Sequence, residues 1–147
     1  MAAKTPKNIR PDRRNISGQK AEKFLAKKPK NIDENTLGLL FETLCVRDLR
    51  IYSEAIGGNV YHYRDKSGLE CDTVIHLRNG NYGLMEIKLG GTKLIEEGIK
   101  NLTALQKKID TTKMMNPSFL AIVVGIGEYA YRREDGIYII PISCLKN

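Results

Sequence analysis

The chain of 147 residues lacks an apolar run long enough to cross a bilayer. Its basic N-terminus is not followed by a hydrophobic stretch, so it does not have the pattern of a secretory signal. These two absences predict a cytoplasmic protein that does not use a membrane. The length and the apolar fraction of 41% are ordinary for a single soluble domain with one core.

Cysteine is also scarce. Cys45, Cys71 and Cys144 are odd in number, widely spaced and set among apolar residues. This pattern favours reduced packing residues over disulfides or a zinc site. The sequence lacks internal repeats and the glycine-rich phosphate loop GxxxxGK[ST], which excludes nucleotide binding by that route.

Acidic residues are few near the N-terminus. Residues 1–30 hold ten Lys or Arg against Asp12 and Glu22, whereas residues 31–147 hold 14 basic and 15 acidic groups. The net charge of +7 is therefore concentrated in the first segment, which also carries three of the five prolines. We expect a basic flexible linker or tail at 1–30 and a folded domain at 31–147. Such an arm can attach to phosphate, although a solvated tail is the commoner case.

The apolar spacing of the domain predicts two helices, at 31–58 and 92–110. Strand patterns are predicted at 59–65, 69–77, 81–88 and 118–127, followed by a terminal hairpin at 129–134 and 136–142. This order indicates an α/β domain in which helices flank a mixed β-sheet and one helix crosses between strands. We predict that the tyrosines at 61, 63, 129 and 131 pack within the sheet. Stacking on nucleic-acid bases is the less favoured role for them.

Several charged side chains are expected to lie on apolar surfaces. Glu42 projects from an apolar stretch of the first helix, and Glu70 and Asp72 share one face of a strand. On the next strand, Glu86 and Lys88 share a face. Because a buried carboxylate needs a cation, a metal or a network of donors, these residues are candidates for a site.

The loop between the two strands decides whether the acids converge. A two-residue turn at 79–80 would point Asp72 away from Glu86. A three-residue loop at 79–81 instead places Asp72 opposite Lys88, so that all three side chains meet. We therefore expect either an odd number of residues in this loop or a bulge in one of the two strands.

Two close carboxylates beside a lysine suit a hard divalent cation. Mg²⁺ or Mn²⁺ binds through oxygen and keeps some of its water. Such an ion acidifies water and neutralises charge on a phosphate, while an ammonium orients the nucleophile or stabilises the same charge. Two carboxylates, a divalent cation and a lysine together predict an enzyme that hydrolyses phosphodiester bonds. A mere surface ion pair of Glu86 with Lys88 is disfavoured by the convergence of three acids with the lysine.

These residues resemble the signature of the PD-(D/E)XK nuclease superfamily: Glu42 on an opening helix, Asp72 on a strand, and Glu86-Ile87-Lys88 on the next strand. Over residues 36–145 the chain also resembles the nuclease-like domain of unknown function found behind an AAA-type ATPase in many bacterial and archaeal proteins. The likeness is carried by the runs GLLFETLCVRDLR, GGNVYHYRDKSGLECDTVI, GLMEIKLGG and YAYRREDGIYIIPISCL.

The resemblance implies a restriction-endonuclease-like core and a role for each site residue. Asp72 and Glu86 would hold the metal together with the Ile87 carbonyl. Lys88 would orient or activate water, and Glu42 would hold a metal-bound water or a second ion. Supporting roles would fall to Glu70, Arg64 and Gln106.

The resemblance also implies partners. The chain would be a DNA-cleaving relative or fragment of an AAA-type ATPase protein, with the ATPase in the same chain or in another, and a homodimer where two strands are cut. Two other interpretations stay open. One is a non-catalytic module that regulates an ATPase or binds nucleic acid, and the other is a fold stabilised by a Glu42–Lys88 ion pair.

Overall fold

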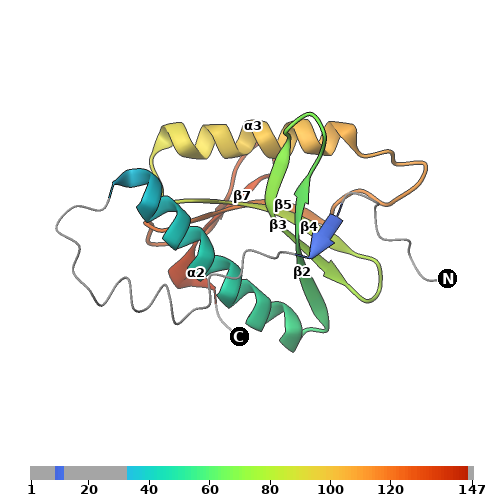
Figure 1. Cartoon of the computed structure of the whole chain (residues 1–147), viewed down its shortest axis with the longest axis horizontal. Coiled ribbons are helices and arrows are strands. Elements are labelled where there is room, and N and C mark those ends of the chain that lie inside the picture. Colours follow the sequence, from blue (N-terminus) through green and yellow to red (C-terminus); the bar gives the residue numbers. More distant parts are fainter. Residues whose placement is uncertain (1–8, 12–32, 146–147) are drawn as a thin grey trace.

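The computed structural model describes residues 9–11 and 33–145. The predicted linker at 1–30 lies outside the described residues apart from 9–11. The part that the structure describes forms one mixed sheet of seven strands, with a long helix on each face (Figure 1). The predicted α/β class with helices flanking a mixed sheet is confirmed.

The strands are β1 (Ile9–Pro11), β2 (Gly58–Arg64), β3 (Glu70–Leu77), β4 (Tyr82–Lys88), β5 (Phe119–Val124), β6 (Tyr131–Arg132) and β7 (Tyr138–Pro141). The helices are α2 (Glu34–Ala55), α3 (Thr92–Lys108) and the short 3-10 helix η1 (Ile142–Cys144). The spatial order is β1-β2-β3-β4-β5-β7-β6. Pairing is antiparallel from β1 to β4 and between β6 and β7, and parallel from β4 through β5 to β7. Helix α3 is the predicted crossover, between β4 and β5.

Strand β1 was not predicted from the sequence. Its three residues pair antiparallel with Tyr61–Tyr63 of β2 and extend the sheet at that edge. Three residues are too few to show the alternation of apolar and polar side chains by which a strand is recognised.

Helix α2 begins at a capped N-terminus, where Asp33 accepts a hydrogen bond from the Thr36 N–H at 2.8 Å. Only one side of this helix is buried. Its buried residues are Leu40, Cys45, Val46, Leu49 and Ser53, while Leu37, Leu39 and Ile51 are exposed. No helix among residues 33–145 has the length and apolar character to span a membrane.

The sheet separates two cores. The α3-side core contains Leu102 and Leu105 of α3 with Leu84 and Ile122 from the strands. The α2-side core contains neighbouring residues of the same strands, among them Met85, because successive strand residues face opposite sides. Even-numbered β4 residues therefore face α3, and odd-numbered ones face α2.

Cys45 and Cys71 are packing residues, as predicted, whereas Cys144 is half-buried and belongs to neither core. All three are free thiols, and Cys45 and Cys71 are buried. Burial, with a smaller contribution from Asp48 and Glu42, raises the pKa of Cys45 to about 12, so this thiol stays protonated at neutral pH.

The tyrosine prediction holds for one pair and is wrong for the other. Tyr61 and Tyr63 pack against the α3-side core. Tyr129 and Tyr131 are exposed, because Tyr131 lies in β6, a two-residue strand at the open edge of the sheet, and Tyr129 lies in the bend before it.

Gly83 of β4 is expected to be intolerant of a side chain. A Cβ at this position would overlap the ring of Phe119 on β5. Gly83→Ala should lower the free energy of unfolding by about 1–3 kcal/mol, the usual cost of overpacking. Chemical denaturation measures this value. Gly38→Ala in α2 is the control, since its Cβ would meet only Leu89 Cδ1 at 4.0 Å and should raise stability by about 0.5–1 kcal/mol. Equal stability of the two variants would contradict the packing argument.

Candidate functional site

The β3–β4 connection has an odd loop, as expected, but in a different register. Leu77 N–H donates to the Asn81 carbonyl at 2.8 Å, so the loop is 78–80 rather than 79–81. The pairing between the strands is regular as far as Thr73–Met85 and ends there. The predicted pairing of Asp72 with Lys88 is therefore wrong. The pair that closes the loop lies one residue earlier on both strands than the prediction required.

Strand β3 also contains a bulge, which was the other arrangement expected from the sequence. It pairs with β2 in one register at Tyr61–Val74 and in a shifted register at Tyr63–Cys71. Cys71 and Val74 both enter the α3-side core, although regular alternation would send them to opposite faces. The irregularity thus lies at Asp72-Thr73. The predicted sharing of one face by Glu70 and Asp72 is wrong for this reason.

The Asp72 side chain takes the place of a backbone hydrogen-bond partner that Ile87 lacks on β3. Its Oδ2 accepts a hydrogen bond from the backbone N–H of Ile87 at 2.9 Å, just beyond the last β3–β4 pair. The same oxygen lies 3.5 Å from Lys88 Nζ, and the side chain is buried. The Ile87 N–H therefore fixes the orientation of Asp72, while the role of the Ile87 carbonyl stays a prediction.

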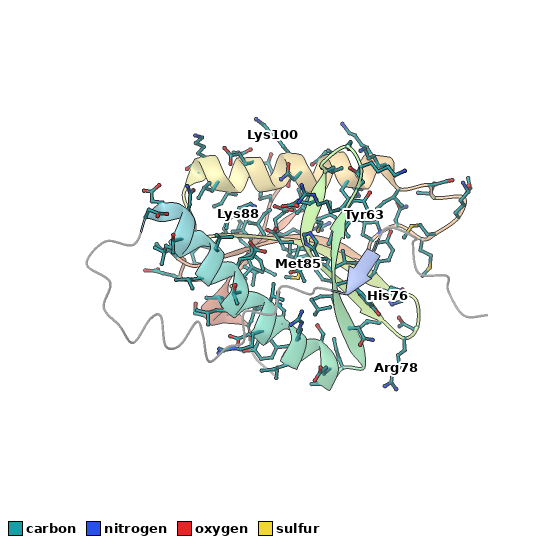
Figure 2. The ribbon with its side chains drawn as sticks, in the orientation of Figure 1. Tyr63, His76, Arg78, Met85, Lys88 and Lys100 are labelled. Atoms are coloured by element: carbon teal, nitrogen blue, oxygen red, sulfur yellow. The ribbon has the colours of Figure 1, made fainter. Side chains whose placement is uncertain are left out.

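Glu86 and Lys88 lie under helix α3. Lys88 Nζ is 2.7 Å from Glu86 Oε2, and Glu86 is only 1% exposed. A Cβ on Gly98 of α3 would lie 3.4 Å from both Glu86 Cβ and Lys88 Cε, so this helical glycine lets α3 approach the pair closely. Figure 2 shows Lys88 on the inner side of α3 and Lys100 pointing outward from the same helix.

The cluster has a strongly perturbed carboxyl group. Burial, and next the nearby charge of Asp72, raise the pKa of Glu86 to about 7, although Lys88 and Asn101 oppose the rise. Burial alone would lower the pKa of Lys88, but attraction to Asp72 and Glu86 outweighs it and raises that pKa. At neutral pH Lys88 is therefore a cation, and Glu86 keeps its proton to a higher pH than an ordinary glutamate does.

One oxygen of Glu86 stays unsatisfied. Oε1 is buried and has no hydrogen-bond partner of normal distance and angle within the described ranges. Asn101 is near enough to lower the pKa of Glu86, but it does not supply such a bond to Oε1. Buried polar atoms without a partner are rare in proteins, and a bound water molecule or ion commonly satisfies them.

Glu42 does not join this cluster. It is half-buried on α2, which packs against the opposite face of the sheet from Glu86. Within residues 33–145 no group of three or more His, Cys, Asp or Glu side chains is arranged to hold a metal. Lys88 forms its ion pairs with Asp72 and Glu86. They are not the Glu42–Lys88 ion pair on which the interpretation as an ion-pair-stabilised fold depends.

The three supporting candidates lie elsewhere on the surface. Glu70 Oε2 is 3.6 Å from Arg64 Nη1 and 3.9 Å from His62 Nε2, so its carboxylate faces β2. Gln106 lies exposed near the end of α3. The structure does not bring these residues to Lys88.

Two residues that sequence patterns did not single out contribute to the site. Gly98 allows the close approach of α3, and Asn101, one turn later, lies beside Glu86. The signals that could have found them are a glycine inside a helical pattern and a polar residue at the border of its apolar stripe.

The cluster offers two carboxylates to a divalent cation. Mg²⁺ is commonly held in proteins by one or two carboxylates and keeps several waters, so a third acid is not required. Glu86 Oε1 is the oxygen that Lys88 leaves unbound, and Ile87 N–H fixes Asp72, which contacts the same Lys88 ammonium as Glu86. These residues fit Mg²⁺ or Mn²⁺ through Asp72 and Glu86.

Comparison with known proteins identifies a family. No curated protein and no solved structure matches the chain significantly. A family model described as "Domain of unknown function (DUF4143)" matches residues 37–145, a range that contains Asp72, Glu86 and Lys88. Because this match covers most of the chain, the protein belongs to the DUF4143 family of domains of unknown function.

Proposed function

We propose that the domain is a metal-dependent nuclease that hydrolyses DNA phosphodiester bonds with Mg²⁺ or Mn²⁺ at Asp72 and Glu86. The observation that carries the proposal is the buried cluster of these two acids with Lys88, in which Glu86 has a raised pKa and an unsatisfied oxygen. Strongly perturbed carboxyl groups gather at functional sites, since burial and like charges are what tune an acid for catalysis. The resemblance to PD-(D/E)XK nucleases supports the same assignment.

Each residue of the cluster has a defined task. A bound ion would acidify a water molecule and neutralise charge on the phosphate. Lys88 stays protonated because its pKa is raised, so it orients water or stabilises phosphate charge and does not accept the proton. Ile87 N–H holds Asp72 in place. Glu86 is ionised more fully above pH 7, and metal binding should strengthen there.

A second candidate function has its own support. Lys88 already contacts both carboxylates, and the described residues bring no third acid to them. A non-catalytic module that binds nucleic acid or regulates an ATPase would need no more than this closed ion cluster.

DNA cleavage separates the two candidates. The purified chain is incubated with linear duplex, single-stranded and branched DNA, either with Mn²⁺ or with a chelator. The nuclease proposal predicts cutting that requires the metal, on at least one of these substrates. Binding of DNA without cutting in Mn²⁺ and in Mg²⁺ would favour the non-catalytic module.

A further inference from the structure

The sheet register places a tyrosine at the same level as Glu86. Glu86 pairs with Ile122, Ile122 pairs with Ile139, and Ile139 pairs with Tyr131. Paired residues point to the same face, and Ile139 lies in the α3-side core, so Tyr131 faces the same side as Glu86. Three strand spacings of about 4.8 Å separate the two positions by about 14 Å.

Tyr131 belongs to an exposed aromatic surface. Tyr129 is 70% exposed and Tyr131 is 45% exposed, and their ring centroids are 6.0 Å apart with 56° between the planes. Ile126, three residues earlier, is 84% exposed. We call Tyr129 and Tyr131 the tyrosine surface, and Ile126 lies in the segment that leads to it. Large apolar side chains that gather in the open mark interaction sites more often than scattered ones do.

The segment that leads to the tyrosine surface lies beside the strand end that carries Lys88. Gly125 N–H donates to the Leu89 carbonyl at 3.0 Å, directly after Lys88. A Cβ on Gly90 would lie 3.9 Å from Ile126 Cβ. The chain segment that follows Lys88 therefore contacts the segment that leads to Tyr129.

The hairpin that presents the tyrosines is tied to α3. Arg133 Nη1 lies 3.2 Å from Glu96 Oε1 of the helix, and Arg133 Nε lies 3.1 Å from Asp135 Oδ2 within the hairpin turn. A surface held in this way loses little conformational freedom when a ligand binds.

We propose that the tyrosine surface stacks the unpaired bases of single-stranded nucleic acid whose phosphates lead to the Asp72–Glu86–Lys88 cluster. Every base has a π-face that stacks on an exposed aromatic ring, whereas the bases of a duplex are already stacked on each other. Lys93, exposed in the first turn of α3 and without an ion pair in the described part of the chain, supplies positive charge for the phosphates. The inference rests on the proposed function and names its substrate class as single-stranded.

The test measures binding in a chelator, where hydrolysis cannot occur. The full chain and its Tyr129→Ala/Tyr131→Ala variant are titrated with a labelled oligothymidylate and with a duplex of the same length. We expect single-strand binding to weaken roughly tenfold to a hundredfold, the usual loss when stacked aromatic rings are removed, and duplex binding to change little. The Tyr129→Phe/Tyr131→Phe variant should bind like the wild type, because it keeps both rings.

Tyr138→Ala is the matched control. This tyrosine is also exposed and lies on the same hairpin, but its neighbour Ile139 faces α3, so Tyr138 faces the other side, where Arg132 covers its ring at 5.6 Å. Its loss should leave single-strand binding unchanged.

Two results would overturn the inference. One is unchanged binding of the oligothymidylate by the double alanine variant. The other is a molecular mass in solution that rises with protein concentration in the wild type but not in the double alanine variant. That result would assign the surface to a second copy of the chain. Absence of DNA cleavage would count against the nuclease proposal alone, since the binding assay does not depend on hydrolysis.

Discussion

Replacement of Lys88 by methionine is expected to lower the rate of metal-dependent DNA hydrolysis by roughly 10²–10³-fold or more, as loss of one charge-stabilising donor does in other enzymes. The physical reason is the position of the ammonium, 2.7 Å from Glu86 and 3.5 Å from Asp72. Methionine keeps the apolar stem under Gly98 and removes only the charge. Single-turnover cleavage in Mn²⁺ measures the loss.

Lys100→Met is the matched control for this experiment. Lys100 is on the outer side of α3 and exposed, so the same substitution there should leave the rate unchanged (Figure 2). Loss of Lys88 also leaves two buried carboxyl groups without their cation, which weakens the fold. Uptake of a proton by Glu86 relieves this repulsion, and circular dichroism identifies the conditions in which the variant is folded. Equal cleavage by the folded Lys88→Met variant would contradict the assigned role.

The second large effect is a loss of stability with rising pH. The pKa of Glu86 is raised from 4.5 to about 7 in the folded state, so the folded protein binds this proton more tightly than the unfolded chain. The contribution of Glu86 is therefore fully present below pH 4.5 and is lost as the pH rises towards 7. The expected loss is on the order of 3 kcal/mol. Chemical denaturation in a chelator at several pH values measures it.

Glu86→Gln isolates this contribution from that of other titrating groups. The amide does not ionise, so the difference in unfolding free energy between the wild type and this variant should change over the same pH range. Mg²⁺ should restore stability to the wild type mainly above pH 7, because a metal binds the ionised carboxylate. Parallel stability curves for the two proteins would show that Glu86 titrates normally.

The local part of the site could be predicted from the sequence. Glu86 and Lys88 are two residues apart on a strand, and strand geometry alone places them on one face. The position of Asp72 depended on register, which local patterns constrain only to an odd loop or a bulge. The bulge at Asp72-Thr73 contains no glycine or proline to indicate it, so only the pairing with β2 reveals it.

Long-range topology accounts for the predictions that failed. Tyr129 and Tyr131 have an ordinary strand pattern, but β7 is inserted between β5 and β6. This leaves Tyr131 on the edge strand and Tyr129 in the bend before it. Glu42 has apolar neighbours on its helix, as predicted, yet the face of the sheet that α2 covers is decided by the whole fold. Helical spacing cannot determine which side of a sheet a helix will occupy.

The central claim is that Asp72 and Glu86 form a divalent-metal site, and calorimetric titration with Mn²⁺ tests it most directly. The wild type near pH 7 should bind the ion and release protons, since the raised pKa of Glu86 keeps this carboxyl partly protonated and it must ionise to bind. Glu86→Gln should bind far more weakly and release no proton. Absence of binding by the wild type, or equal binding by both proteins, would contradict the account.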